Sequence, residues 1–200
     1  MIQISEEISR SAQINQRLTE MRERHGYPQN HKNDLLMAYF DIIAEHHQAI
    51  GLLIKENLIG SSFAFVRPIA ETLYRAAWVN ACATKQQLEQ IFVDDDFDFP
   101  KDMMEKIDTA YSTQDFFQNL KRLTWKSMCS YTHSGSLQIA RRFGGNDGYV
   151  GPNYSEAEIL EVLRATTAML ILIAILFFKG TGCAKEALEV ERIGLNAESD

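Results

Sequence analysis

The chain has little cysteine, glycine or proline, and fewer basic than acidic residues. Its three cysteines, Cys82, Cys129 and Cys183, are far apart among 200 residues, so no disulfide framework or paired-thiolate metal site is expected. The chain has 11 glycines and 4 prolines, which is too few for a collagen-like or disordered chain. A formal net charge of -7 disfavours a protein that coats DNA over its whole surface. The sequence therefore predicts one soluble globular domain over residues 1–200.

A secretory signal is also lacking, because residues 1–7 are acidic rather than basic and contain no apolar core. Together with the unpaired cysteines, this predicts a cytoplasmic protein. One uncharged apolar stretch, residues 165–178, lies between Arg164 and Lys179. As a helix it would extend about 21 Å, less than the roughly 30 Å of a membrane's hydrocarbon core. We expect a buried bundle helix and no membrane partner, with membrane-directed toxicity as a less favoured alternative.

Apolar residues recur at helical spacing along most of the chain, and no alternation is long enough to build a sheet. The predicted helices cover residues 5–24, 33–59, 63–82, 84–93, 101–110, 112–143, 155–180 and 183–193. Thr84 with Gln87, and Ser155 with Glu158, have the spacing of a capping box. These patterns predict an all-α fold, an antiparallel bundle of four to five main helices plus short helices, with a buried apolar C-terminal helix. Residues 1–32 form its N-terminal helix and turn, and residues 194–200 a polar tail.

Three charged residues, Arg67, Glu71 and Arg75, follow one another at intervals of four on an otherwise apolar helix. This spacing places them on one stripe of the helix surface. The stripe has two interpretations. It is either the solvent-facing edge of the helix, with ion pairs between residues four apart, or an Arg-Glu-Arg network that lines a cleft. In a cleft, the arginines could hold an anionic group or a carboxylate of a partner.

A hydroxyl-rich segment surrounds one histidine, His133, midway along the predicted helix 112–143. Tyr131 and Ser134 flank it, and Gly135 indicates a bend or a close approach of two backbones. His133 is the best single candidate for acid-base catalysis, with Arg141 about 80° round the predicted helix. The alternative is a buried histidine that a hydroxyl or a backbone carbonyl satisfies.

No metal and no cofactor are expected. The acidic run 94–98 has no glycine, which a calcium loop of the EF-hand type needs for its turn. His46 and His47 are consecutive, so on a helix they point about 100° apart and cannot bind the same ion.

In two segments, the chain resembles uncharacterised bacterial all-helical domains of unknown function. The first is Phe63 to Trp78, with Arg67 and Glu71. The second is Trp125 to Arg142, with its Tyr-Thr-His-Ser-Gly sequence. Those domains are distantly similar to HEPN and abortive-infection helical bundles. The resemblance covers residues 35–178 and implies a helical bundle, frequent dimerisation and a place in bacterial conflict systems such as toxin-antitoxin or phage defence.

Active HEPN ribonucleases carry an arginine followed a few residues later by a histidine, and the two act on RNA without a metal. Arg24 and His31 have that spacing, but Gly26 and Pro28 lie between them, so they do not share one regular helix. Arg122 and His133 share a predicted helical face but lie too far apart for the motif.

These observations predict a cytoplasmic homodimer that binds a protein partner within a bacterial or phage conflict system. The acidic composition favours a basic partner. The binding residues would be Arg67, Glu71, Arg75, Tyr131 and Ser134. The alternative is a metal-independent endoribonuclease, in which His133 acts as acid or base and Arg67 or Arg141 stabilises phosphate charge. RNA is a partner only in this second hypothesis.

Overall fold

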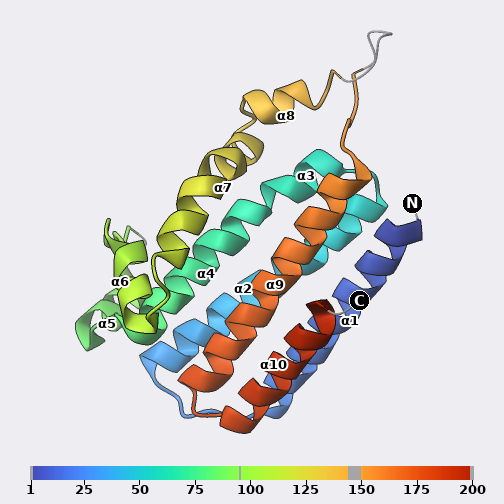
Figure 1. Cartoon of the computed structure of the whole chain (residues 1–200). Coiled ribbons are helices and arrows are strands. Elements are labelled where there is room, and N and C mark those ends of the chain that lie inside the picture. The colour runs from blue at the N-terminus through green and yellow to red at the C-terminus, as the bar shows by residue number, and fades with distance from the viewer. Residues whose placement is uncertain (1, 95, 144–149, 199–200) are drawn as a thin grey trace.

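The computed structural model describes residues 2–94, 96–143 and 150–198, which form helices joined by short connections (Figure 1). The helices are α1 (Ile2–Arg24), α2 (His31–Lys55), α3 (Ile59–Ala64), α4 (Val66–Ala81), α5 (Lys85–Val93), α6 (Met103–Tyr111), α7 (Phe116–Thr132), α8 (Ser136–Ala140), α9 (Glu156–Gly180) and α10 (Ala184–Glu198). No strand occurs within these ranges. The predicted all-α class is confirmed, and both predicted capping boxes are present, at the starts of α5 and α9.

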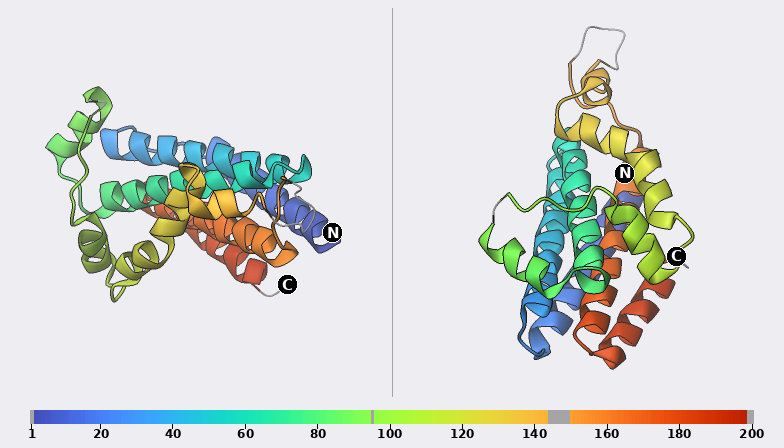
Figure 2. Two further views of the ribbon diagram at one scale, coloured as in Figure 1. Left: turned by 90° about the horizontal axis from the view of Figure 1, so that it is seen from above. Right: turned by 90° about the vertical axis from the view of Figure 1, so that its left-hand side faces the viewer.

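The core is built around α9, which packs against α1, α2, α4 and α10. Its fully buried side chains include Leu170, Ile173, Phe177 and Phe178. The buried apolar helix expected from the sequence is therefore confirmed. α7 lies along α3 and α4 on the side away from α10, and α8 projects past the end of α3 (Figures 1 and 2). α7 buries only Met128 and α8 buries no residue, so this outer layer is largely exposed.

Two predicted long helices are interrupted in the structure. The helix expected over 63–82 is divided at Phe65 into α3 and α4, and Pro68 occupies the first turn of α4, where its missing N–H costs no helical hydrogen bond. The helix expected over 112–143 ends at Thr132 and resumes at Ser136 as α8. At the C-terminus, residues 194–198 belong to α10 rather than to a polar tail.

By length and composition alone, α9 could cross a membrane. The complete helix is longer than the uncharged stretch 165–178, because polar turns extend it at its N-terminal end. Half of its most apolar window is buried inside the bundle. A central core helix of a folded bundle has the same properties.

Candidate functional site

Arg67 and His133 meet at the contact between α4 and the end of α7. Nη1 of Arg67 donates a hydrogen bond to Nε2 of His133. His133 therefore accepts at Nε2, and a neutral ring carries its proton on Nδ1. Since His133 is exposed, it is not the buried core histidine that was one of the two sequence-based alternatives. Its ring is accessible to a ligand.

The guanidinium of Arg67 is fixed from two further directions. Its Nε and Nη2 donate to Oε1 of Glu71 at 3.2 and 3.0 Å, and its Cζ lies 4.9 Å from the centre of the Trp125 ring. Lys121 Nζ lies 5.0 Å from the same ring. Four-fifths of the Arg67 side chain is covered. The charged stripe of α4 is thus neither an open edge nor an interior cleft, because α7 covers its N-terminal half.

The end of α7 holds His133 in place. The hydroxyl of Thr132 lies between two carbonyl acceptors, at 2.9 Å from that of Met128 in its own helix and at 3.2 Å from that of Ala64 on α3. Ser134 then adopts a left-handed conformation (φ 52°), and the chain turns back so that Gly135 N–H donates to the Ser130 carbonyl at 2.7 Å. A Cβ at Gly135 would lie 2.6 Å from Ser130 Oγ and 3.0 Å from its Cα. The bend predicted from this glycine is confirmed, and it needs a residue without a side chain.

The other predicted site residues lie apart from the Arg67–His133 pair. Arg75 is exposed and its guanidinium lies 4.9 Å from the centre of the Phe99 ring. Arg141 pairs with Glu158 at the start of α9, because the helix that would have aligned it with His133 ends at Thr132. Tyr131 packs its ring on Phe63, at 5.2 Å between centres. Of the proposed catalytic residues, the structure brings together Arg67 and His133 but not Arg141.

The pair Arg24 and His31, which has the HEPN spacing, forms no site. Arg24 ends α1 and pairs with Glu20 at 3.0 Å, while the His31 ring packs on Phe92 at 5.2 Å. The described residues contain no group of three or more histidine, cysteine or acidic side chains that could hold a metal ion.

A second histidine, His47, is buried among α1, α2 and α9. Its Nε2 lies 2.8 Å from Ser11 Oγ and 3.0 Å from Thr167 Oγ1. The side-chain amide of Asn15 donates to Nδ1 at 2.9 Å, so Nε2 carries the proton. Burial lowers the pKa of His47 to about 4. The order Ser-His-Asn resembles a catalytic triad, but a protonated Nε2 cannot take the serine proton, so this cluster is structural.

Sequence reasoning missed the charge of the outer layer. Residues 116–143, which include α7 and α8, contain no aspartate or glutamate. Their basic residues are Lys121, Arg122, Lys126, Arg141 and Arg142. A signal for this surface is present in the sequence, since a run of 28 residues without an acidic side chain stands out in a chain of net negative charge. The layer that carries His133 is therefore a local basic surface on an acidic protein.

The comparisons with known proteins give a family but no activity. No curated protein and no solved structure matches the chain significantly. The resemblance to HEPN bundles gains no support from these comparisons and stays a prediction, as does a bacterial origin. A family model does match residues 40–196, a range that includes Arg67, Glu71, Trp125 and His133. This match covers more than half of the chain, which therefore belongs to DUF6988, a family of unknown function.

Proposed function

We propose that the protein binds a strand of RNA along α7 and α8 and cleaves it at the Arg67–His133 pair. The observation that carries this proposal is the direct contact of an arginine and an exposed histidine on a layer without acidic residues. Arginine is suited to phosphate, since it presents several donors in a planar array. A neutral histidine is suited to proton transfer near pH 7.

The proposed reaction uses the ribose 2′-hydroxyl as the nucleophile. A phosphate placed between the two side chains takes over the Arg67 donor, which frees Nε2 of His133. Nε2 then accepts the 2′-hydroxyl proton while the 2′-oxygen bonds to phosphorus and the bond from phosphorus to the 5′-oxygen breaks. Arg67 stabilises the charge on the phosphate oxygens. The 5′-oxygen takes up a proton from water, and His133 returns its proton to the hydroxide that this leaves. The strand then ends in a cyclic phosphate.

Trp125 and Lys121 extend the proposed site along α7. An indole next to a phosphate site can stack a base of a single strand. Lys126 and Arg122 are exposed on the same helix and would contact phosphates further along the strand. A strand that follows α7 would thus meet successive cations before it reaches His133.

The test is cleavage of labelled single-stranded RNA in the presence of EDTA. The wild-type protein should produce fragments that end in a cyclic phosphate, and His133→Ala and Arg67→Ala should each reduce the rate at least about hundredfold. His31→Ala is the matched control, because His31 is also exposed but packs on Phe92. Equal rates for His133→Ala and His31→Ala would contradict the proposal.

Protein binding is a second candidate, and the exposed apolar side chains of the α8 segment favour it. Leu137, Ile139 and Phe143 are 43%, 53% and 66% exposed, and several exposed apolar side chains within one short segment favour a protein interface. A homodimer through α8 fits this surface. A basic partner, which the net charge of -7 favours, would bind outside the basic layer of α7 and α8. On the resemblance to abortive-infection bundles, we further propose that this binding takes place within a bacterial conflict system.

Molar mass in solution tests the homodimer. Ile139→Asp should convert a dimer into a monomer, whereas Leu188→Asp, at an exposed position on α10, should not. A wild-type protein that is monomeric at high concentration would contradict a homodimer through α8.

A further inference from the structure

A cluster of polar side chains at the N-terminal end of α3 contains a buried hydroxyl without a partner. The hydroxyl oxygen of Tyr154 is buried, and no described residue forms a hydrogen bond with it. A buried donor that is left without an acceptor costs free energy, because it has lost its hydrogen bonds to water. A ligand that accepts a hydrogen bond from Tyr154 would remove this cost.

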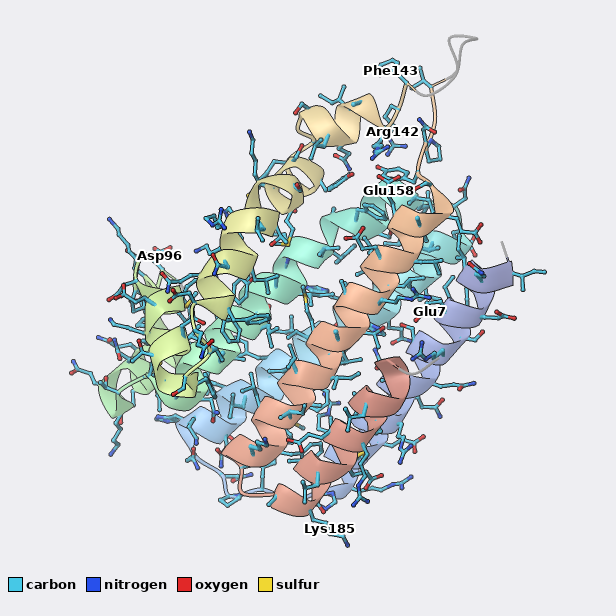
Figure 3. The ribbon with its side chains drawn as sticks, viewed as in Figure 1. Glu7, Asp96, Arg142, Phe143, Glu158 and Lys185 are labelled. Carbon is cyan, nitrogen blue, oxygen red and sulfur yellow. The ribbon has the colours of Figure 1, made fainter. Side chains whose placement is uncertain are left out.

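The guanidinium of Arg142 lies beside this hydroxyl. Both groups pack on the backbone of Gly60, where a Cβ would lie 2.8 Å from Arg142 Nη2 and 3.0 Å from Tyr154 Oη. Figure 3 shows Arg142 between the end of α8 and the start of α9. The absence of a side chain at Gly60 therefore allows the guanidinium and the phenol to face the same place.

The cluster carries one positive charge that no described carboxylate balances. The titratable groups that act on Tyr154 are Tyr131, Arg142, Arg141 and Glu158. Glu158 pairs with Arg141, whereas Arg142 makes no ion pair or side-chain hydrogen bond with another described residue. Burial raises the pKa of Tyr154, so its hydroxyl keeps its proton near pH 7. A half-buried guanidinium and a neutral phenol thus offer N–H and O–H donors to an anion.

This cluster and the Arg67–His133 pair lie along the same face of α3. Gly60, Ala64 and Arg67 follow one another at intervals of four and three residues, which places them on one side of α3 and the first turn of α4. From Gly60 to Arg67 the chain rises by roughly 10 Å. α8 lies against this face, because Gln138 donates to the Gly60 carbonyl at 3.2 Å. One extended strand that passes along α8 can therefore reach both places.

We infer that Arg142 and Tyr154 bind a second phosphate group of the RNA strand that is cleaved at the Arg67–His133 pair. This inference rests on the proposed function and adds that the strand continues past α8, beyond the cleaved bond. Arg142 donates to the phosphate oxygens, and the Tyr154 hydroxyl gains the acceptor that it lacks. The substrate is then an internal stretch of single-stranded RNA rather than a single nucleotide.

The experiment measures binding of a labelled single-stranded RNA of about eight nucleotides by fluorescence anisotropy. Every ribose of this RNA is 2′-O-methylated, so the strand lacks the nucleophile and stays intact. Arg142→Gln should raise the Kd at least about fivefold, because one phosphate contact is lost. The control is Arg17→Gln, since Arg17 pairs with Glu189 on the layer of α1 and α10, and its Kd should equal that of the wild type.

Two tyrosine variants separate binding from folding. Tyr154→Phe removes a hydroxyl that has no described partner, so the melting temperature should not fall, but the Kd for the RNA should rise several-fold. Tyr111→Phe is the matched control, because the Tyr111 hydroxyl accepts from Asn80 at 2.8 Å. Its melting temperature should fall and its Kd should stay unchanged. A Tyr154→Phe variant that behaves like Tyr111→Phe would overturn the inference.

Inorganic phosphate, titrated alone by calorimetry, distinguishes a strand from a free ion. We expect no saturable binding at millimolar concentrations. Phosphate binding that Arg142→Gln abolishes, with unchanged RNA binding, would overturn the inference in favour of a site for free phosphate.

The rate of cleavage of unmodified RNA separates this inference from the proposed function. RNA binding that depends on Arg142 and Tyr154, without any cleavage by the wild type, would refute the proposed cleavage but support the second phosphate site. Cleavage with an unchanged KM in both variants would refute the second phosphate site but support the proposed cleavage.

Discussion

Arg67 and His133 are 66 residues apart in the sequence, yet their side chains share a hydrogen bond. Glu71 and Trp125 hold the arginine from α4 and α7, and the last turn of α7 holds the histidine. An arginine and a histidine that are both prepositioned lose little entropy when an anion binds between them. The prepositioned pair therefore suits the anion-binding site that we propose for it.

Glu71 is a positioning residue in this arrangement. Glu71→Gln keeps an oxygen near Arg67 but removes the charge that fixes its direction, so the RNA cleavage rate at saturation should fall several-fold. The apparent KM should not rise, because removing a negative charge does not weaken phosphate binding. The control is Glu89→Gln, since Glu89 also pairs with a basic residue one turn away, Lys85, but at an exposed position of α5. A rise in KM without a fall in rate would contradict the positioning role.

Gly135 and Gly26 allow a matched test of the bend that follows His133. Gly135→Ala introduces a Cβ 2.6 Å from Ser130 Oγ and 3.0 Å from its Cα. Either the Ser130 hydroxyl, which accepts from the Leu137 N–H, or the end of α7 must therefore shift. Unfolding by urea should show a loss of about 1 to 3 kcal/mol, together with reduced RNA cleavage. Gly26→Ala places a Cβ where nothing lies within 4 Å, and its stability should change by less than about 0.5 kcal/mol. Similar losses for both variants would contradict the close approach.

The sequence predicted the helices well because each carries its own periodicity and caps. Ser155 with Glu158 marks the start of α9, and both features are local. Residues 112–143 were less predictable, since apolar spacing continues through Gly135 although the helix does not. Whether a glycine is tolerated within a helix or ends it depends on packing against α3, which the local sequence does not contain.

The site was predictable in part. Arg67 and His133 were each selected from their own helices, but their contact depends on how α7 lies across α3 and α4, which no local pattern specifies. Arg141 was placed near His133 only because an unbroken helix was assumed. Trp125 was overlooked because an aromatic residue at helical spacing is usually part of a core.

Asp108 caps α7 from the preceding helix. Its two carboxylate oxygens accept from the backbone N–H groups of Phe117 and Gln118 at 2.9 and 3.0 Å, and Thr113 donates to it as well. Burial raises the pKa of Asp108, but the combined hydrogen bonds outweigh burial and hold it below its usual value. Asp108→Asn places an amide against a backbone donor and should cost about 1 to 3 kcal/mol of unfolding free energy.

The sign of the pH dependence follows from that lowered pKa. The stabilisation from Asp108 should be complete above the usual pKa of 3.8 and should be lost as the pH falls through the lower value of the folded state. Asp102→Asn is the control, because Asp102 is half exposed and pairs only with Lys106 one turn away; urea unfolding should show a change below about 0.5 kcal/mol. A loss as large as that of Asp108→Asn would refute the capping role.

His47 should make the whole bundle less stable in mild acid. Burial lowers its pKa from 6.5 to about 4, so between these values the unfolded chain binds a proton that the folded protein does not. Unfolding free energy should therefore fall as the pH drops from 6.5 towards 4, by roughly 3 kcal/mol in total, and level off below that. His47→Gln should flatten the part of this curve between pH 5 and 7, where carboxylates contribute little. The control is His31→Gln at an exposed histidine, which should leave the slope of the stability curve unchanged. A wild-type curve that is already flat between pH 5 and 7 would mean that His47 is not sealed between α1, α2 and α9.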